Sequence, residues 1–202
     1  MDSAYKIVNL KLLIDEVGEN TAKTVLSSFC CPLNSDVEMF LRDRAVDFAK
    51  QGLSQTHLVM APHFDQSILV GYFTLANKYI SVPAEPLSNT QRKRIAKFSI
   101  FDSHLGAYCL STPLIAQLGK NYFDGVDKLI TGDVLLHLAC RKVASIQMDL
   151  GGRYAYLECE DKPKLTEFYR RNGFQEFDRR TLDSDETGLD GEYLVQMLKY
   201  IK

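Results

Sequence analysis

The spacing of apolar residues between positions 153 and 174 predicts a strand followed by a helix. Residues 153–159 are aromatic and mostly apolar, which suits a strand buried on at least one face. Asp161 is placed to cap the helix, and Pro163 fits its first turn, where a missing N–H costs nothing. Gly173 can end it in a left-handed conformation. One helical face carries the apolar residues Leu165, Phe168 and Tyr169.

Helical periodicity predicts three more helices. Residues 34–51 form an amphipathic stripe closed by Gly52, and residues 131–150 form another that ends at Gly151 and Gly152. Residues 89–101 are expected to form a helix that carries Arg92, Lys93, Arg94 and Lys97. A solvated helix face explains these charges better than a nucleic-acid site does, because no aromatic residues are interleaved with them.

Shorter apolar segments predict strands. These are residues 56–60, 67–75, 107–118, 174–182 and 193–201. The first two form a hairpin around a turn at 62–66, and residues 81–88 form a loop. Pro113 makes the 107–118 strand irregular or bulged. An acidic, flexible connection at 183–191 joins the last two strands.

Composition indicates an ordinary globular protein. The chain has 202 residues, 46% hydrophobic and 25% charged, and no apolar run approaches the length of a membrane span. A single domain and a cytoplasmic location are therefore expected, since the first residues do not form a signal sequence. The net charge of −2 argues against broad nucleic-acid affinity but leaves room for a local basic patch.

The cysteines and histidines indicate neither disulfides nor a metal site. The five cysteines are odd in number and lack Cys-x-x-Cys pairing, and the four histidines lack metal-ligand spacing. The adjacent Cys30 and Cys31 are poorly placed for a relaxed bridge. We expect free thiols and no metal.

Four segments, in this order, resemble the N-acetyltransferases of the GNAT superfamily. They are Gly71-Tyr-Phe-Thr-Leu75, Leu114 to Leu118, Thr131-Gly-Asp-Val-Leu-Leu136 and Phe168-Tyr-x-x-x-Gly-Phe174. The resemblance covers the chain from about Phe29 onward. It implies an α/β fold of the α+β type, with a mixed, mostly antiparallel central sheet, a splayed cofactor-binding strand and flanking helices, in one domain of residues 1–202.

The resemblance also implies an acetyl-CoA site. Helix N-termini bind phosphate through exposed backbone N–H groups and the helix dipole, and Gly132 is placed there, between Thr131 and Asp133. Asp127 and Ile130 stand where the family has Gln or Arg and a first glycine, so Lys128 or Lys120 is expected to meet the phosphates. A helix entry without a ligand is the alternative explanation.

Two further parts of the acetyl-CoA site are implied by the same resemblance. The backbone of Leu118, Gly119 and Lys120 is expected to face the pantetheine arm and the acetyl carbonyl. Lys162 stands where many relatives have an asparagine that contacts the cofactor.

Acetyl transfer from a thioester to an amine needs an acid for the departing thiolate and a base for the amine proton. In the family a tyrosine at the position of Tyr169 lies near the sulfur of CoA, and a phenol stays protonated at neutral pH. Glu158 and Glu160 project to one side of a strand end, so either is a candidate base. The structural alternatives are a core tyrosine and carboxylates paired with Lys162 or Lys164.

These observations predict an N-acetyltransferase of a small-molecule or protein amine, with dimers common in the family. Residues 29–51 followed by Gly71 to Leu75 also resemble the GNAT branch of toxins that acetylate aminoacyl-tRNA and are held by an antitoxin. A third hypothesis is a GNAT-like binding domain without catalysis, because Asp127, Ile130 and Lys162 depart from the pattern of active relatives.

Overall fold

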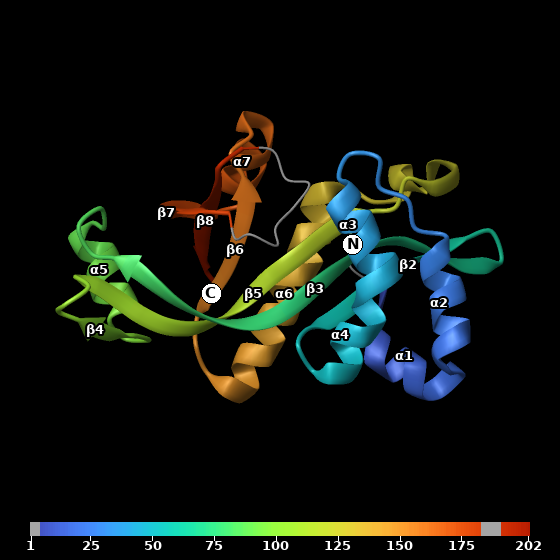
Figure 1. Cartoon of the computed structure of the whole chain (residues 1–202), viewed down its shortest axis with the longest axis horizontal. Coiled ribbons are helices and arrows are strands. Elements are labelled where there is room, and N and C mark those ends of the chain that lie inside the picture. The colour runs from blue at the N-terminus through green and yellow to red at the C-terminus, as the bar shows by residue number, and fades with distance from the viewer. Residues whose placement is uncertain (1–4, 183–190) are drawn as a thin grey trace. The chain divides into compact units, whose positions relative to one another are not determined.

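A computed structural model describes residues 5–182 and 191–202. Within these ranges eight strands form a mostly antiparallel sheet in the order β1-β2-β3-β5-β6-β8-β7, with β4 paired to β5 (Figure 1). This mixed sheet with flanking helices confirms the predicted fold class. The predicted acidic connection at 183–190 lies outside the described residues.

Contacts divide the chain into two compact units. Unit 1 comprises Met1–Ala76 and Ile115–Ala139, and unit 2 comprises Asn77–Leu114 and Cys140–Lys202. Three elements contribute residues to both units: β3 (Gln66–Pro83), β5 (Ala107–Lys120) and α6 (Gly132–Leu150). Neither unit is therefore a continuous stretch of sequence, and a single domain remains a prediction.

Unit 1 contains antiparallel strands with short helices. Its other elements are β1 (Lys6–Asn9), α1 (Leu10–Val17), α2 (Glu19–Ser27), α3 (Ser35–Met39), a π-helical turn η2 (Phe40–Arg44), α4 (Ala45–Gln51), β2 (Gln55–His63) and a 3-10 segment η3 (Phe123–Leu129). The predicted 34–51 helix is thus present as α3, η2 and α4. No prediction covered β1, α1 and α2.

The core of unit 1 surrounds Tyr72, which is fully buried. Its hydroxyl donates to the carbonyl of Val37 at 2.6 Å, and its ring meets that of Phe29 edge to face at 5.1 Å. A buried phenol needs such a partner, because an unpaired polar group inside a core is destabilising. This bond fixes α3 against β3.

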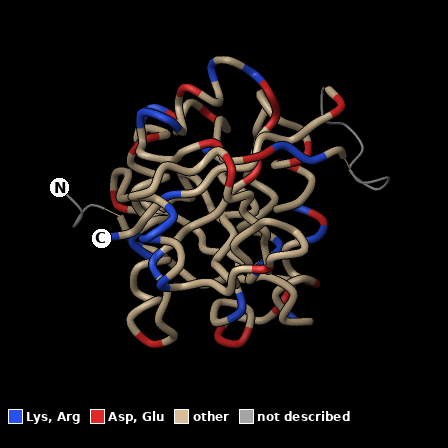
Figure 2. The backbone as a smooth tube through the Cα atoms, turned by 90° about the vertical axis from the view of Figure 1, so that its left-hand side faces the viewer, with Lys and Arg blue, Asp and Glu red and all other residues tan. Residues whose placement is uncertain are grey.

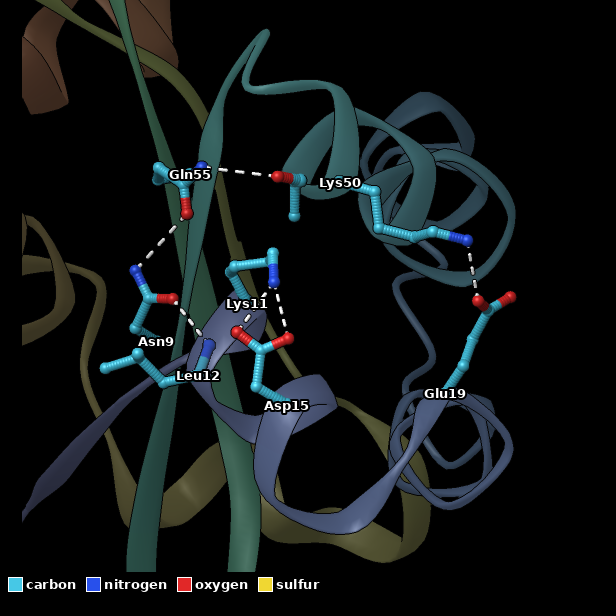
Figure 3. A network of polar contacts seen from close by, with 8 residues as sticks. Asn9, Lys11, Leu12, Asp15, Glu19, Lys50 and Gln55 are labelled. Atoms are coloured by element: carbon cyan, nitrogen blue, oxygen red, sulfur yellow. Dashed lines mark hydrogen bonds and ion pairs between the residues drawn. The ribbon is translucent and has the colours of Figure 1, made fainter.

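Polar contacts join the N-terminal elements at the surface of unit 1 (Figure 3). The side chain of Asn9 accepts from the backbone N–H of Leu12 at 3.1 Å, which caps α1, and donates to Gln55 at 3.4 Å. Lys50 of α4 pairs with Glu19 of α2 at 2.8 Å. Exposed pairs of this kind contribute at most about 1 kcal/mol each, so packing rather than charge holds these helices.

Unit 2 contains the C-terminal strands and two helices. Its elements are α5 (Asn89–Ile95), β4 (Ile100–Asp102), β6 (Tyr154–Glu160), α7 (Pro163–Arg171), β7 (Gln175–Thr181) and β8 (Tyr193–Tyr200). Strand β8 pairs antiparallel with β6 and with β7, while β5 runs parallel to β6 at Leu114 and Tyr156. The predicted order of strand, helix and strand after residue 153 is present.

Three local predictions were wrong. The helix predicted at 89–101 ends at Ile95, because Ile100–Asp102 pairs with β5 and the Asp102 carboxylate accepts from the amides of His104 and Leu105 to form a turn. The strand predicted at 67–75 continues to Pro83, into the expected loop. Asp161 does not cap α7; it pairs with Arg179 at 2.5 Å.

Candidate active site

Helix α7 presents Tyr169 through a sharply terminated final turn. Gly173 has φ of +85°, and the amide of Phe174 donates to the carbonyl of Tyr169 at 3.1 Å. A residue with a Cβ is strained at this φ, so glycine is required here. The helix begins at Pro163, as expected, and follows the end of β6 directly.

The Tyr169 ring is held while its hydroxyl is left unpaired. The ring is half-buried and packs edge to face against Phe168 and Phe174, with centroids 5.0 and 6.0 Å away. Among the described residues, no group hydrogen-bonds to its hydroxyl. Desolvation, and to a smaller extent the neighbouring Cys159, raises the pKa of Tyr169. The phenol therefore carries its proton at neutral pH and has it available for donation.

Glu158 is fully engaged in a polar cluster on β6, β7 and β8. Arg180 donates to its two carboxylate oxygens at 2.7 and 2.6 Å, Tyr156 donates to one of them, and Gln196 donates to the same oxygen at 3.3 Å. Desolvation would raise the pKa of Glu158, but the hydrogen bonds from Arg180 and Tyr156 outweigh it and lower the pKa. A stabilised carboxylate is a weak base, so this geometry favours a structural role.

Glu160 and Lys162 form the pair that the sequence suggested as the alternative to catalysis. Lys162 Nζ lies 2.9 Å from a carboxylate oxygen of Glu160, whose side chain is 10% exposed while that of Lys162 is 48% exposed. Both residues take part in further interactions. Lys162 also precedes the first residue of α7 without capping it through its side chain.

At the end of β5, Gly119 is required by packing within unit 1. A Cβ at this position would lie 2.4 Å from Cγ1 of Val37 and 3.2 Å from the Phe29 ring. Leu118 is half-buried beside it. Lys120 lies over the Tyr122 ring at 5.5 Å, and its Nζ is 4.0 Å from the Asp127 carboxylate. These contacts account for Gly119 and Lys120 without any ligand, and they explain why an aspartate stands at position 127.

Asn121, which sequence reasoning missed, fixes the chain just beyond β5. It is 2% exposed. Its side-chain oxygen accepts from the amides of Cys30 at 3.0 Å and Phe123 at 3.1 Å, and its nitrogen donates to the carbonyls of Ser28 at 3.2 Å and Leu69 at 2.8 Å. No local pattern distinguishes such a buried asparagine from one in a surface turn.

The N-terminus of α6 keeps part of its backbone available. The Thr131 hydroxyl accepts from the amide of Val134 at 3.2 Å and so caps the helix. In the part of the chain that the structure describes, the amide of Gly132 has no hydrogen-bond acceptor. Asp133 adds a negative charge in the first turn, which opposes an anion.

Lys128 lies four residues before the first residue of α6. It is exposed and forms no ion pair within residues 5–182 and 191–202. It lies near the end of η3, whose path includes left-handed Asp124 and Gly125 and is fixed by a 2.7 Å bond from the Tyr5 hydroxyl to the Leu129 carbonyl. Of the two lysines predicted to meet phosphate, Lys120 is paired and Lys128 has no partner among the described residues.

No three His, Cys, Asp or Glu side chains among the described residues are grouped to hold a metal ion. None of the helices described is both long enough and apolar enough to cross a membrane.

The fold is the GNAT-like fold expected from the sequence. Solved structures of KacT and AtaT share it over nearly the whole chain. No protein-family model matches this sequence, and no curated protein matches it.

Three structures illustrate the likeness. A KacT mutant with a tyrosine replaced by phenylalanine has a TM-score of 0.62 at 15% identity, covering 96% of this chain and 94% of that chain. AtaT complexed with acetyl-methionyl-tRNAfMet has a TM-score of 0.59 at 16% identity, covering 95% and 93%. AtaTR bound with AcCoA has a TM-score of 0.54 at 16% identity, covering 96% and 93%. At these identities the likeness establishes the fold.

Proposed function

We propose that the protein is an acetyl-CoA-dependent N-acetyltransferase whose acceptor is the amino group of an aminoacyl-tRNA. The observation that carries this proposal is the whole-chain likeness to AtaT, which was solved in complex with acetyl-methionyl-tRNAfMet. A second GNAT-fold toxin, KacT, has the same fold over 96% of this chain. This support favours charged tRNA over a small-molecule or protein amine as acceptor.

Tyr169 is the proposed general acid. The neutral amine attacks the acetyl carbonyl, a C–N bond forms, and the C–S bond breaks to release CoA as a thiolate. The Tyr169 phenol donates its proton to that sulfur. Its raised pKa and the absence of a hydrogen-bond partner for its hydroxyl among the described residues support this role, because the phenol keeps its proton at neutral pH and no described group holds it. Glu158 is held by Arg180, so the proposed acceptors of the amine proton are water and Glu160, which would have to leave its pair with Lys162.

The proposed acetyl-CoA site combines the N-terminus of α6 with the end of β5. The free amide of Gly132 and the exposed Lys128 are suited to phosphate, while Thr131 is committed to capping. Leu118, Gly119 and Lys120 are proposed to offer backbone groups to the pantetheine arm. AtaTR was solved with AcCoA bound, which supports the same co-substrate here.

An antitoxin is the proposed protein partner, because the similar folds belong to toxins of toxin–antitoxin systems. Expression of a tRNA-acetylating enzyme without such a partner would stop growth. The Tyr169→Phe variant should then be tolerated.

The proposal is tested by incubating the purified protein with radiolabelled acetyl-CoA and a pool of aminoacylated tRNA. Label in acid-precipitable RNA is expected with charged tRNA and not with uncharged tRNA. A parallel reaction with free amino acids, polyamines and peptides measures thiol release. Release with those amines and no labelled RNA would replace the tRNA proposal with a small-molecule or protein acceptor. No calorimetric binding of millimolar acetyl-CoA would leave a GNAT-like binding domain.

A further inference from the structure

Unit 2 contains a pocket of about 220 Å³ that the proposed acetyl transfer does not use. Helix α5 forms one side, with Gln91 and Arg94, and the ends of β7 and β8 form another. Three aromatic residues, Tyr154, Phe177 and Tyr200, line it. The space is of the size of one planar heterocycle rather than of a drug-sized ligand.

Planar side chains that contact one another line the pocket. The Arg94 guanidinium carbon lies 4.8 Å from the centroid of the Tyr200 ring, and the Tyr154 ring meets Tyr200 edge to face at 5.5 Å. Aromatic rings and arginine guanidinium planes are the groups on which proteins stack unpaired nucleic-acid bases.

A pair of amides supplies hydrogen-bonding groups beside these rings. Gln91 Nε2 donates to Gln175 Oε1 at 3.0 Å, and Gln91 Oε1 accepts from the amide of Ser88 at 2.8 Å. Gln91 is thereby fixed by the cap of α5. The side-chain nitrogen of Gln175 keeps its donors unused by any described residue, so it can donate to a ring nitrogen or carbonyl of a base.

The charges around the pocket favour phosphate. Arg94 and Lys202 line it, and blue Lys and Arg positions lie next to the C-terminal end of the chain in Figure 2. The lining carboxylate, Glu176, is paired with Arg170 at 2.7 Å and Arg179 at 3.1 Å, so its charge is offset.

The basic residues between positions 92 and 97 differ in whether their side chains are bonded within the described protein. Arg92 donates to the carbonyls of Leu87 at 3.0 Å and Glu85 at 3.1 Å, which orders the loop before the helix. Lys93 and Lys97 are exposed and form no ion pair in the described chain. Lys93 lies in α5 and Lys97 in the turn that follows it, and both can contact a phosphate backbone.

We propose that this pocket binds one unpaired nucleotide of an RNA, with the base stacked among Tyr154, Tyr200 and Arg94 and its phosphate met by Arg94 and Lys202. This proposal rests on the proposed function, in which the acceptor is an RNA. It adds a contact for that RNA outside the residues proposed for acetyl transfer. This site could not be predicted from the sequence, because its basic and aromatic residues come from different segments. Residues 89–101 carry the basic residues without interleaved aromatics, and the aromatic residues come from β6, β7 and β8.

The test is binding of a short single-stranded RNA carrying 2-aminopurine, without acetyl-CoA, to the full chain. The chain has no tryptophan, so the 2-aminopurine signal can be observed without interference. We expect fluorescence quenching on binding, and we expect Arg94→Ala to weaken affinity about tenfold and abolish the quenching, from the typical contribution of a stacked base. Arg94→Lys keeps the charge but loses the plane, so it should lose the quenching as well.

Lys93→Ala is the matched control, because Lys93 neighbours Arg94 on α5 but does not line the pocket. It should weaken affinity about twofold or less, reduce the salt dependence and keep the quenching. Equal losses in Arg94→Ala and Lys93→Ala with no quenching in either, or no RNA binding by a correctly folded wild type, would overturn the proposal. Gln175 is exposed, so Gln175→Ala should not unfold the protein. We expect this variant to bind the RNA more weakly, which would support the proposal independently of Arg94.

Acetyl transfer is measured separately on the same variants. Arg94→Ala should raise the KM for charged tRNA and leave kcat unchanged. Loss of RNA binding in Arg94→Ala with an unchanged KM for charged tRNA would refute the pocket as a contact for the acceptor and leave the proposed function standing. Normal RNA binding without acetylation would refute the proposed function alone.

Discussion

The end of β5 and helix α7 differ in how far their polar side chains are hydrogen-bonded within the protein. After β5, every hydrogen-bonding position of the Asn121 side chain is used within unit 1, and the position beside Gly119 is filled by Val37 and Phe29. On α7, the Tyr169 ring is packed but its hydroxyl has no partner among the described residues. Saturated groups hold a backbone in place, whereas a protonated and unpaired group is available for chemistry.

Replacing Tyr169 with phenylalanine gives the largest expected effect. The hydroxyl makes no hydrogen bond in the described protein, so its removal should change the free energy of unfolding by less than about 0.5 kcal/mol. If it protonates the leaving thiolate, kcat should fall about 10²- to 10⁴-fold with little change in KM. Steady-state acetylation kinetics and urea unfolding measure the two quantities.

Tyr156→Phe is the control for that experiment, because its hydroxyl is engaged. It donates to Glu158 and accepts from Gln196 at 2.6 Å. This variant should lose about 1–2 kcal/mol of stability, since buried partners are left unsatisfied. Unchanged kcat in Tyr169→Phe would remove the acid and leave Tyr169 as a packing residue.

Asn121→Ala removes a fully hydrogen-bonded side chain at the end of β5, in contrast to Tyr169→Phe. Four hydrogen bonds to backbone groups are lost in a buried position, so we expect a loss of about 3 kcal/mol in the free energy of unfolding. Asn77→Ala is the control: Asn77 is exposed and accepts one bond from Ser111 at 2.9 Å, so its loss should stay below about 1 kcal/mol. Similar losses in both variants would show that Asn121 does not hold this region.

The sequence allowed the later elements to be predicted because their signals are local. Gly173 after a helical stripe and the apolar periodicity of residues 131–150 each depend on neighbouring residues, and α6 and α7 follow them. Pairings between distant segments lack such signals: Arg180 joins Glu158 across 22 residues, and Asn121 joins Cys30 across 91. For the same reason, the candidate residues could be named from the sequence. It could not be predicted that both carboxylate oxygens of Glu158 are hydrogen-bonded, or that the Tyr169 hydroxyl has no partner among the described residues.

Glu158→Gln tests the saturated carboxylate and should cost about 2 kcal/mol at pH 7, since Arg180 loses its charged partner in a largely buried site. The pKa of Glu158 is lowered in the folded protein. Its contribution is therefore fully present above the unfolded pKa of about 4.3 and is lost as the pH falls through the lower folded value. Urea unfolding from pH 7 to pH 2 should show wild type and variant converging only in acid.

Glu19→Gln is the matched control for Glu158. Interactions with Lys23 and Lys50 lower the pKa of Glu19 to about 2, but this carboxylate lies at the surface of α2. Its smaller stability difference should disappear in 1 M salt at pH 7, where the screening length is about 3 Å, while that of Glu158 persists. If the stability difference between wild type and Glu158→Gln also disappears in 1 M salt, the Glu158–Arg180 pair is screened by solvent like an exposed pair.

The smallest expected effect distinguishes the two lysines near the proposed acetyl-CoA site. Lys120 is held by Asp127 and the Tyr122 ring, whereas Lys128 is exposed and forms no ion pair with a described residue. If the α6 N-terminus receives pyrophosphate, Lys128→Ala should weaken acetyl-CoA binding about two- to fivefold, and the effect should shrink with added salt. Lys120→Ala should leave affinity within about twofold and lower stability slightly, because it removes an intramolecular contact. Calorimetry of both variants with acetyl-CoA and with CoA compares them. A larger loss in Lys120→Ala would mean that the lysine leaves Asp127 when the ligand binds, and that a group already paired within the protein can also bind the cofactor.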